Sequence, residues 1–241
     1  MAISSKWELI TLDKLGKIEG GRQASRLDNS LFEEGNIPLI GGEEVTKSIF
    51  NVTSKVKKYY NLKGLKQSKF FTKGKVLFIR SGNAAGDSAF LNFDACLTQN
   101  IYSFNSFKEI SDPKFIKYCF DYPNIKEKLI KLAKSDTAQP NLTLNRLLTV
   151  KFLCPPHEIQ QKIGDILSTY DELIENNKRQ IEMLQNIRTS IFKEWFMNLR
   201  FPQNSGLSLN DLITVGGATE KFINYLKLHQ LLKEKNLQNS L

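Results

Sequence analysis

The stretch "SDTAQPNLTLNRLLTVKFLCPPHEIQQKI", residues 135–163, decides how this chain is organised. It begins with polar, loop-forming residues and passes through a short apolar strand. It then breaks at Pro155 and Pro156 and continues as the front of an amphipathic helix. Consecutive prolines interrupt both helices and strand ladders. The sequence therefore predicts a boundary here, with different kinds of structure on its two sides.

The segment after the boundary carries a heptad pattern. From His157 onward the core positions step alternately by four and three residues over more than four heptads, as in a coiled coil. A helix over residues 157–199 would be roughly 65 Å long, and Pro202 would end it. A domain of about 150 residues offers too little apolar surface for such a helix, so we expect a second long helix as its partner. The alternative is a helix folded back wholly onto its own domain.

The first 156 residues predict a compact α+β domain. The runs "WELITLDKL" and "KVLFIRSG" have the short, partly alternating apolar pattern of strands. The run "NIPLIGGEEV" predicts a strand edge broken by Pro38 and a glycine turn. Asp112 before Pro113 predicts a helix start, followed by a break at Pro123 and a second helical run to Ala133. We expect three parts: this domain at 1–156, a long helix at 157–202, and a linker with a short helical tail at 203–241.

Charge divides the chain at the same place. The first 156 residues contain 24 Lys and Arg against 15 Asp and Glu, and so carry the whole net charge of +9. No acidic residue occurs between Glu44 and Asp87, where lysines alternate with aromatic residues. Such a basic surface attracts polyanions, above all phosphate backbones. The alternative is a solvated lysine-rich face, with the aromatic residues in the core.

Other kinds of chemistry have little support in the sequence. There is no P-loop pattern, no glycine-rich dinucleotide motif, and no neighbour at metal-ligand spacing for His157 or His229. Cys96, Cys119 and Cys154 are odd in number and lie among apolar residues, which predicts reduced core thiols. The chain lacks a secretory signal and a run of about 18 apolar residues. We expect a non-catalytic, cytoplasmic protein without a cofactor or a metal.

The junction and the helix after it resemble the DNA specificity subunits of type I restriction-modification systems. In that family a target recognition domain ends in a T-Q-P-N-L-S-L-like segment, an apolar strand and P-P-x-x-E-Q-Q-K-I, and a long helix then runs to a K-E-W-F-V-x-F-R-F-P-like end. The stretches "WELITLDKLGKI" and "GKVLFIRSGNAAGDSAFLNFDACLTQNIYSF", with its L-x-Q-N pattern, also resemble the family, so that the likeness covers about residues 5–202. The residues that match the junction and helix motifs are Thr137, Gln139, Pro140, Asn141, Leu142, Thr143, Leu144, Pro155, Pro156, Glu158, Gln160, Gln161, Lys162, Ile163, Lys193, Glu194, Trp195, Phe196, Arg200, Phe201 and Pro202.

The resemblance implies a mixed α/β DNA target recognition domain followed by a coiled-coil-forming spacer helix. In the family the spacer also holds methyltransferase (modification) subunits and, through them, the restriction subunit, and these separate subunits carry out adenine methylation and cleavage. Full-length members have two recognition domains and two spacer helices, whereas this chain has one of each and a different tail. It is therefore similar to a half-subunit. The alternative is a helical adaptor or decoy half that touches DNA without selecting sequence.

The chemistry of individual side chains selects the candidates for DNA contact. Arginine and amide side chains after a glycine turn, or at a strand end before a glycine loop, can reach base edges, whereas lysines suit phosphates. Each candidate could also be an ordinary surface residue. The base-reading candidates are Arg22, Gln23, Arg26, Arg80, Ser81 and Asn83, and the phosphate candidates are Lys57, Lys58, Lys66 and Lys69.

The unpartnered helix predicts a homodimer. Asn177 lies almost at the midpoint of residues 157–199, so antiparallel pairing lets it meet its own copy while the two recognition domains lie at opposite ends. A two-fold symmetric reader predicts a double-stranded DNA target with two inverted half-sites across a fixed spacer. The residues predicted to pair are Ile163, Ile166, Tyr170, Leu173, Asn177, Leu184, Ile187 and Ile191.

Overall fold

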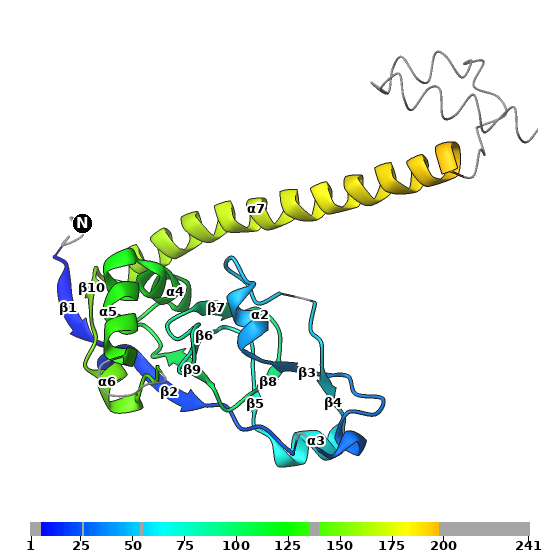
Figure 1. The fold of residues 1–241 in the computed structure, drawn as a ribbon. Helices are drawn as coiled ribbons and strands as arrows, with labels where there is room; N and C mark the ends of the chain where they lie inside the picture. The colour runs from blue at the N-terminus through cyan, green and yellow to red at the C-terminus, as the bar shows by residue number, and fades with distance from the viewer. Residues whose placement is uncertain (1–5, 26, 54, 135–139, 198–241) are drawn as a thin grey trace, which may run out of the picture. The chain divides into compact units, whose positions relative to one another are not determined.

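The computed structural model describes residues 6–25, 27–53, 55–134 and 140–197 (Figure 1). The chain divides into two compact units, Met1–Asn176 and Asn177–Leu241. The first unit contains all the strands found among the described residues and the first part of the long helix. Arg26, the last residues of the expected long helix, and the expected linker and helical tail at 203–241 lie outside the described residues.

The first unit is built on two four-stranded sheets and a two-stranded ribbon. The first sheet is antiparallel, in the order β2-β9-β6-β7, and the second has the order β4-β3-β8-β5, in which β3 and β8 are parallel. The antiparallel ribbon joins the two ends of the domain, β1 (Glu8–Thr11) and β10 (Lys151–Cys154). The strands of the two sheets are β2 (Gly16–Gly20), β3 (Ile37–Ile40), β4 (Tyr59–Tyr60), β5 (Phe70–Phe71), β6 (Lys75–Ile79), β7 (Ser88–Leu91), β8 (Ala95–Leu97) and β9 (Ile101–Ser106).

Strand β6 shows why the domain has two core layers. Its apolar run is buried on both faces, and successive side chains of a strand point to opposite sides of the sheet. Val76 and Phe78 pack in a cluster with the helices that follow β9, whereas Leu77 and Ile79 pack in a cluster with the second sheet. The first sheet is thus covered on one face by helices and on the other by the second sheet. This confirms the α+β class expected from the sequence.

Helices α4 (Pro113–Asp121) and α5 (Pro123–Lys134) confirm the boundaries predicted from the proline positions. The Asp112 carboxylate accepts a hydrogen bond from the Phe115 backbone N–H at 2.9 Å, which satisfies a donor of the first turn of α4. The remaining elements are short, apart from the long helix described below. They are α1 (Leu12–Leu15), a 3-10 turn at Asn29–Leu31, α2 (Gly42–Thr46), α3 (Leu62–Gln67) and α6 (Leu144–Leu148).

Two local predictions were wrong in part. The strand expected over "WELITLDKL" ends at Thr11, because Leu12 and Leu15 turn into the core as the short helix α1. Pro38 does not break its strand but lies inside β3, paired with Tyr59. Its missing N–H does not interrupt this pairing, because Leu39 supplies the next donor to the Lys58 carbonyl at 2.9 Å.

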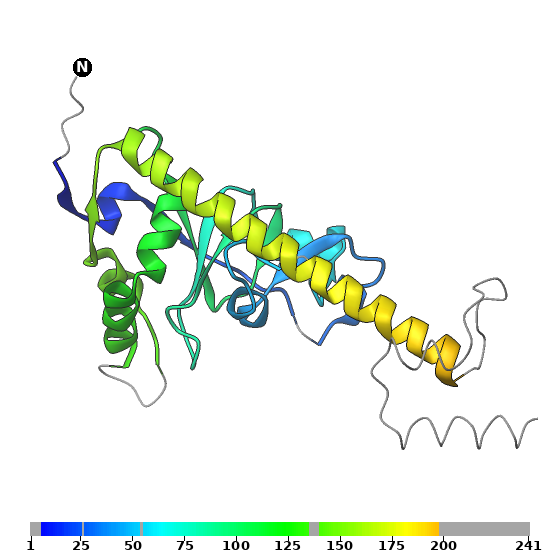
Figure 2. The ribbon, with the colours of Figure 1, turned by 90° about the horizontal axis from the view of Figure 1, so that it is seen from above.

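The long helix is α7 (His157–Phe192), which follows directly from β10 and continues as a π-helical turn, Lys193–Met197 (Figure 2). Its 36 residues correspond to about 54 Å. None of the helices in the described part of the chain combines the length and the apolar character that crossing a membrane requires.

Candidate nucleic-acid interface

Three polar loops from different parts of the sequence meet where β2, β6 and β8 end. The Gly21 N–H donates to the Ile101 carbonyl at 2.9 Å, and the Arg80 N–H donates to the Asn100 carbonyl at 3.0 Å. These backbone bonds hold the loop after β2 and the loop after β6 against the turn between β8 and β9. We call residues 20–23, 80–83 and 98–100 the polar loop cluster. It brings the base-reading candidates Arg22 and Gln23 together with the candidates Arg80, Ser81 and Asn83, which the sequence placed in a separate loop.

Two glycines shape the loop after β6, and hydrogen bonds to residues 140–142 hold it in place. Gly82 and Gly86 have positive φ angles of 87° and 97°, a backbone conformation that side chains disfavour. The Gly82 N–H donates to the Pro140 carbonyl at 3.0 Å, and the Leu142 N–H donates to the Arg80 carbonyl at 2.6 Å. The "PNL" segment of the domain end therefore fixes the "RSG" segment. Two stretches that resemble the specificity-subunit family are hydrogen-bonded to each other.

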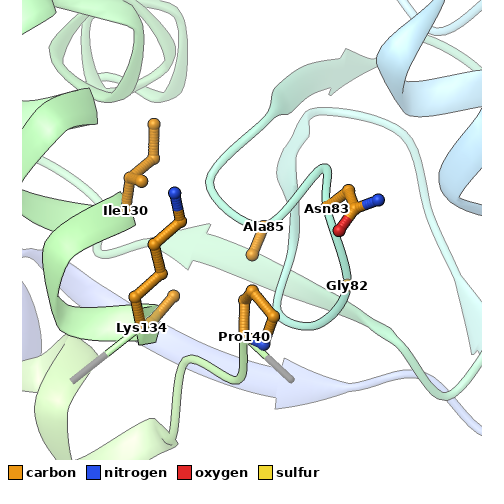
Figure 3. A pocket seen from close by; sticks show the side chains of 7 residues that line it. Gly82, Asn83, Ala85, Ile130, Lys134 and Pro140 are labelled. Carbon is orange, nitrogen blue, oxygen red and sulfur yellow. The ribbon is translucent and has the colours of Figure 1, made fainter. Parts of the chain in front are cut away.

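A small hollow of about 230 Å³ lies between this loop and α5 (Figure 3). Ala85, Ile130 and Pro140 contribute apolar groups to its wall, and Lys134 lies beside them. The exposed Asn83 side chain carries its amide nitrogen away from α5 (Figure 3). Asn83 therefore presents a donor to the outside of the loop, as a residue that contacts a base edge must.

Arg80 is held in a fixed orientation. Its Nη1 donates to the Tyr102 hydroxyl at 3.2 Å, and its guanidinium lies over the Tyr102 ring, 5.3 Å from the centroid. The buried Nε has no hydrogen-bond partner within the described part of the chain. A half-buried guanidinium braced on one side is pre-organised for a bidentate acceptor on the other, such as the edge of guanine.

The turn between β8 and β9 adds two residues that were not among the sequence-based candidates. Gln99 is exposed, and the Thr98 hydroxyl donates to the Asn100 side-chain oxygen. A Cβ atom on Gly42 would lie 3.2 Å from the Asn100 amide nitrogen, so α2 also begins beside this turn. The available signal was the L-x-Q-N pattern, which places two amides between buried strands. Amide side chains can recognise adenine through two hydrogen bonds.

The two described candidates of the loop after β2, Arg22 and Gln23, differ in their exposure to solvent. Arg22 is exposed, whereas Gln23 is half-buried. The Ala24 N–H donates to the Tyr60 hydroxyl at 3.1 Å, and the Ser68 hydroxyl donates to the Arg22 carbonyl at 2.5 Å. The second sheet therefore supports this loop and leaves the Arg22 side chain in solvent.

The lysine-rich segment flanks the polar loop cluster, but its charge is partly compensated. Lys57 pairs with Glu43 at 2.7 Å, and Lys69 pairs with Glu19 at 2.9 Å. Hydrogen bonds from Lys47 and Lys57 lower the pKa of Glu43 to about 2. Both carboxylates come from outside the acid-free segment, so the sequence count overstated its unpaired positive charge. Of the other phosphate candidates, Lys66 is exposed on α3, and Lys58 lies over the Phe32 ring.

The aromatic residues of this segment alternate between two environments. Tyr60 and Phe71 are core residues at 0% and 2% exposure, whereas Tyr59 and Phe70 are 37% and 45% exposed. The sequence left open whether these aromatic residues lie in the core or on the binding surface, and each interpretation applies to one of the two pairs. The first pair stabilises the second sheet, and the second pair is accessible to a ligand.

The three cysteines are wholly or partly buried. Cys96 and Cys154 are buried and Cys119 is half-buried, and all three are free thiols. Burial raises the pKa of all three, that of Cys154 to about 11, so the uncharged thiol is favoured. Across residues 6–197, apart from the gaps named above, no three His, Cys, Asp or Glu side chains are grouped as metal ligands would be.

Helix α7 has two opposite faces. Gln160, Gly164 and Ser168 are buried against the domain, and Asp171 and Glu175 continue this domain face. The opposite face of α7 carries an apolar stripe of six residues, whose side chains are between 41% and 64% exposed. At about 100° per residue, the centres of the two faces lie about 180° apart.

The residues predicted to pair lie mostly on the exposed face. Asn177 is exposed, whereas Ile163 packs partly against the domain core. The members of the apolar stripe are Ile166, Tyr170, Leu173, Leu184, Ile187 and Ile191.

Several known proteins are similar to this chain in sequence. The model of the family "Type I restriction modification DNA specificity domain" matches residues 4–186. The MjaIX specificity subunit of Methanocaldococcus jannaschii is 26% identical over 217 residues, which is 87% of this chain and 48% of that protein. The MjaVIII specificity subunit of the same organism is 25% identical over 85% of this chain and 45% of its own length. The chain thus spans about half the length of these curated relatives.

Solved structures show the same fold at low sequence identity. The type I S subunit from M. genitalium is similar with a TM-score of 0.61 at 18% identity, over 95% of this chain and 50% of that one. The HsdS subunit from Thermoanaerobacter tengcongensis has a TM-score of 0.51 at 18% identity, over 72% and 39% of the two chains. Because the family model matches most of the chain, the chain belongs to the type I restriction-modification DNA specificity family.

Proposed function

We propose that the chain is a cytoplasmic, non-catalytic DNA-binding subunit that selects a target sequence for type I methyltransferase subunits and, through them, for the restriction subunit. The observation that carries this proposal is the polar loop cluster. Three loops with arginine and amide side chains converge at one place, on rigid strands and beside exposed lysines. Side chains on loops that a scaffold fixes are suited to base recognition.

Within the cluster the roles divide by chemistry. Arg22 and Arg80 supply guanidinium donors for guanine, and Asn83 and Gln99 supply amides for adenine. Lys66 on α3 and other exposed lysines contact phosphates, which strengthens binding without selecting sequence. The half-buried Arg80 is the best positioned of these groups, because the Tyr102 contacts fix it before DNA arrives.

We further propose that two copies pair in antiparallel orientation through α7. The support is the exposed apolar stripe opposite the domain face, which continues beyond Asn177. An exposed apolar stripe with heptad spacing, interrupted at Asn177 and Gln180, is typical of the seam of a helical pair. Antiparallel pairing about Asn177 brings the two asparagines together and gives a bipartite target whose half-sites are inverted copies.

The decisive experiment is methylome sequencing of cells that contain the matching methyltransferase subunits, with and without this chain as the sole specificity chain. We expect one methylated motif of two inverted half-sites to disappear when the chain is removed. An unchanged methylome would contradict the DNA-selecting role. A lost motif with two unrelated half-sites would contradict the symmetric dimer alone.

A further inference from the structure

The start of α7 is joined to the domain by a buried polar anchor. The Gln160 side-chain oxygen accepts from the Asp112 N–H at 3.0 Å, and its nitrogen donates to the carbonyls of Pro155 and Ile110 at 2.9 and 3.2 Å. One turn later, a Cβ atom on Gly164 would lie 2.6 Å from the Asp112 carboxylate. Here the helix approaches α4 so closely that only glycine fits. This anchor fixes where α7 begins.

A second set of contacts holds α7 farther along. The Tyr118 hydroxyl donates to the Asp171 carboxylate at 2.6 Å. The two oxygens of Glu175 accept from the backbone N–H and the side-chain nitrogen of Asn51, at 3.0 and 3.2 Å. We call Asn51, Tyr118, Asp171 and Glu175 the distal latch. From Gln160 to Glu175 the attachment extends along about 22 Å of helix.

The distal latch is connected to strand β7 of the first sheet by stacked rings and backbone hydrogen bonds. The Tyr118 ring stacks on Phe50 at 5.2 Å, and Phe50 stacks on Phe90 of β7 at 5.2 Å. The Phe90 N–H donates to the Phe50 carbonyl at 2.7 Å, so the segment that carries Asn51 is paired with the same strand. A movement of α7 relative to the sheet would therefore break the hydrogen bonds to Asp171 and Glu175.

The polar character of the distal latch indicates a role in orientation. Apolar contacts tolerate sliding, whereas hydrogen bonds require defined distances and angles. Burial and the hydrogen bond to Asp171 both raise the pKa of Tyr118, so its hydroxyl remains a donor. With the anchor at one end and the distal latch at the other, α7 cannot rotate about a single point on the domain.

We propose that the distal latch sets the spacer length of the DNA target, so that Tyr118, Asp171, Glu175 and Asn51 are positioning residues that touch no base. This inference rests on the proposed antiparallel dimer, in which α7 joins the two recognition domains. A domain of this size has a radius of gyration of about 16 Å, so a tilt of 10 to 15° would displace its far side by about 3 to 4 Å. That displacement is about one base-pair rise of 3.4 Å. Losing the distal latch therefore widens the range of accepted spacers without changing the half-sites.

The test uses the full chain with its methyltransferase subunits and a DNA library in which the half-sites are constant and the spacer varies by one or two base pairs. The latch variant combines Tyr118→Phe, which keeps the ring stack on Phe50, with Glu175→Ala. The control variant combines Tyr122→Phe with Glu172→Ala, which make the same chemical changes at neighbouring exposed positions. We expect the wild type and the control to prefer one spacer at least about tenfold, and the latch variant to prefer it less than about threefold.

An unchanged spacer profile in the latch variant would overturn the inference, and so would an altered half-site. Binding of the wild type without any spacer preference would reject the bipartite reader itself, which distinguishes the two failures. Circular dichroism verifies the fold of each variant. If the double variant does not fold, Tyr118→Phe alone is measured against Tyr122→Phe, and an equal spacer preference of these two would overturn the inference.

Discussion

Single side chains of the polar loop cluster differ in how firmly the fold holds them. Arg80 is braced by the ring and hydroxyl of Tyr102, whereas Arg22 and Gln99 extend from loops into solvent. A braced side chain loses little conformational entropy on binding. Arg80 should therefore contribute more to sequence selection than its neighbours.

This difference gives a prediction for binding energetics. Arg80→Ala should weaken binding to the target by about 1 to 3 kcal/mol and leave binding to random DNA nearly unchanged. Lys66→Ala should weaken binding to both DNAs alike and reduce the salt slope by about one. Titrations of target and random duplexes at several salt concentrations measure both effects. Equal losses of Arg80→Ala on the two duplexes would refute its role in base reading.

At the scale of elements, α7 has two faces of different character. The domain face is polar or small, from Gln160 through Gly164 to Glu175, and the apolar stripe is left outside. This is the reverse of an ordinary surface helix, whose apolar side faces its own core. The physical consequence is an exposed apolar surface that water disfavours and that a second helix would cover.

Dimerisation should therefore depend on the stripe and not on the neighbouring positions. Ile187→Glu places a charge in the seam and should give a monomer at micromolar concentration. Asn186→Glu introduces the same charge on the other side of the helix, where it should leave the dimer intact. Analytical ultracentrifugation of the full chain measures the mass of each variant. A monomeric wild type, or a dimeric Ile187→Glu variant, would contradict pairing through this stripe.

At the scale of the whole molecule, α7 defines the separation between two recognition domains in the proposed dimer. Inserting one heptad on each side of Asn177 preserves the stripe and the central asparagine pair. It should move the two domains apart by about 21 Å, since each chain adds seven residues between its domain and the centre. We expect a longer preferred spacer with unchanged half-sites. Selection from a library of DNA targets with different spacers would show the change. An unaltered preferred spacer would exclude α7 as the element that sets the spacer length.

Local physical chemistry was enough to determine much of this protein from its sequence. Asp112 before Pro113 set the start of α4, the apolar run "KVLFIRSG" indicated the strand β6, and the proline pair marked where β10 ends and α7 begins. The heptad spacing was sufficient to place the apolar stripe along one side of α7. These signals depend on neighbours within a few residues, where capping, periodicity and backbone restrictions act.

Tertiary structure alone decided which distant groups meet. It joined the loop of Arg80 to the segment of Pro140, paired Lys57 and Lys69 with Glu43 and Glu19, and placed Asn51 against Glu175. No local pattern encodes these partners, because each contact depends on strand pairing between segments far apart in the chain. The sequence by itself determined the boundaries of the main helices and the heptad spacing of the apolar stripe. Tertiary contacts decided that this stripe faces away from the domain, and they fixed the geometry of the polar loop cluster and the distal latch.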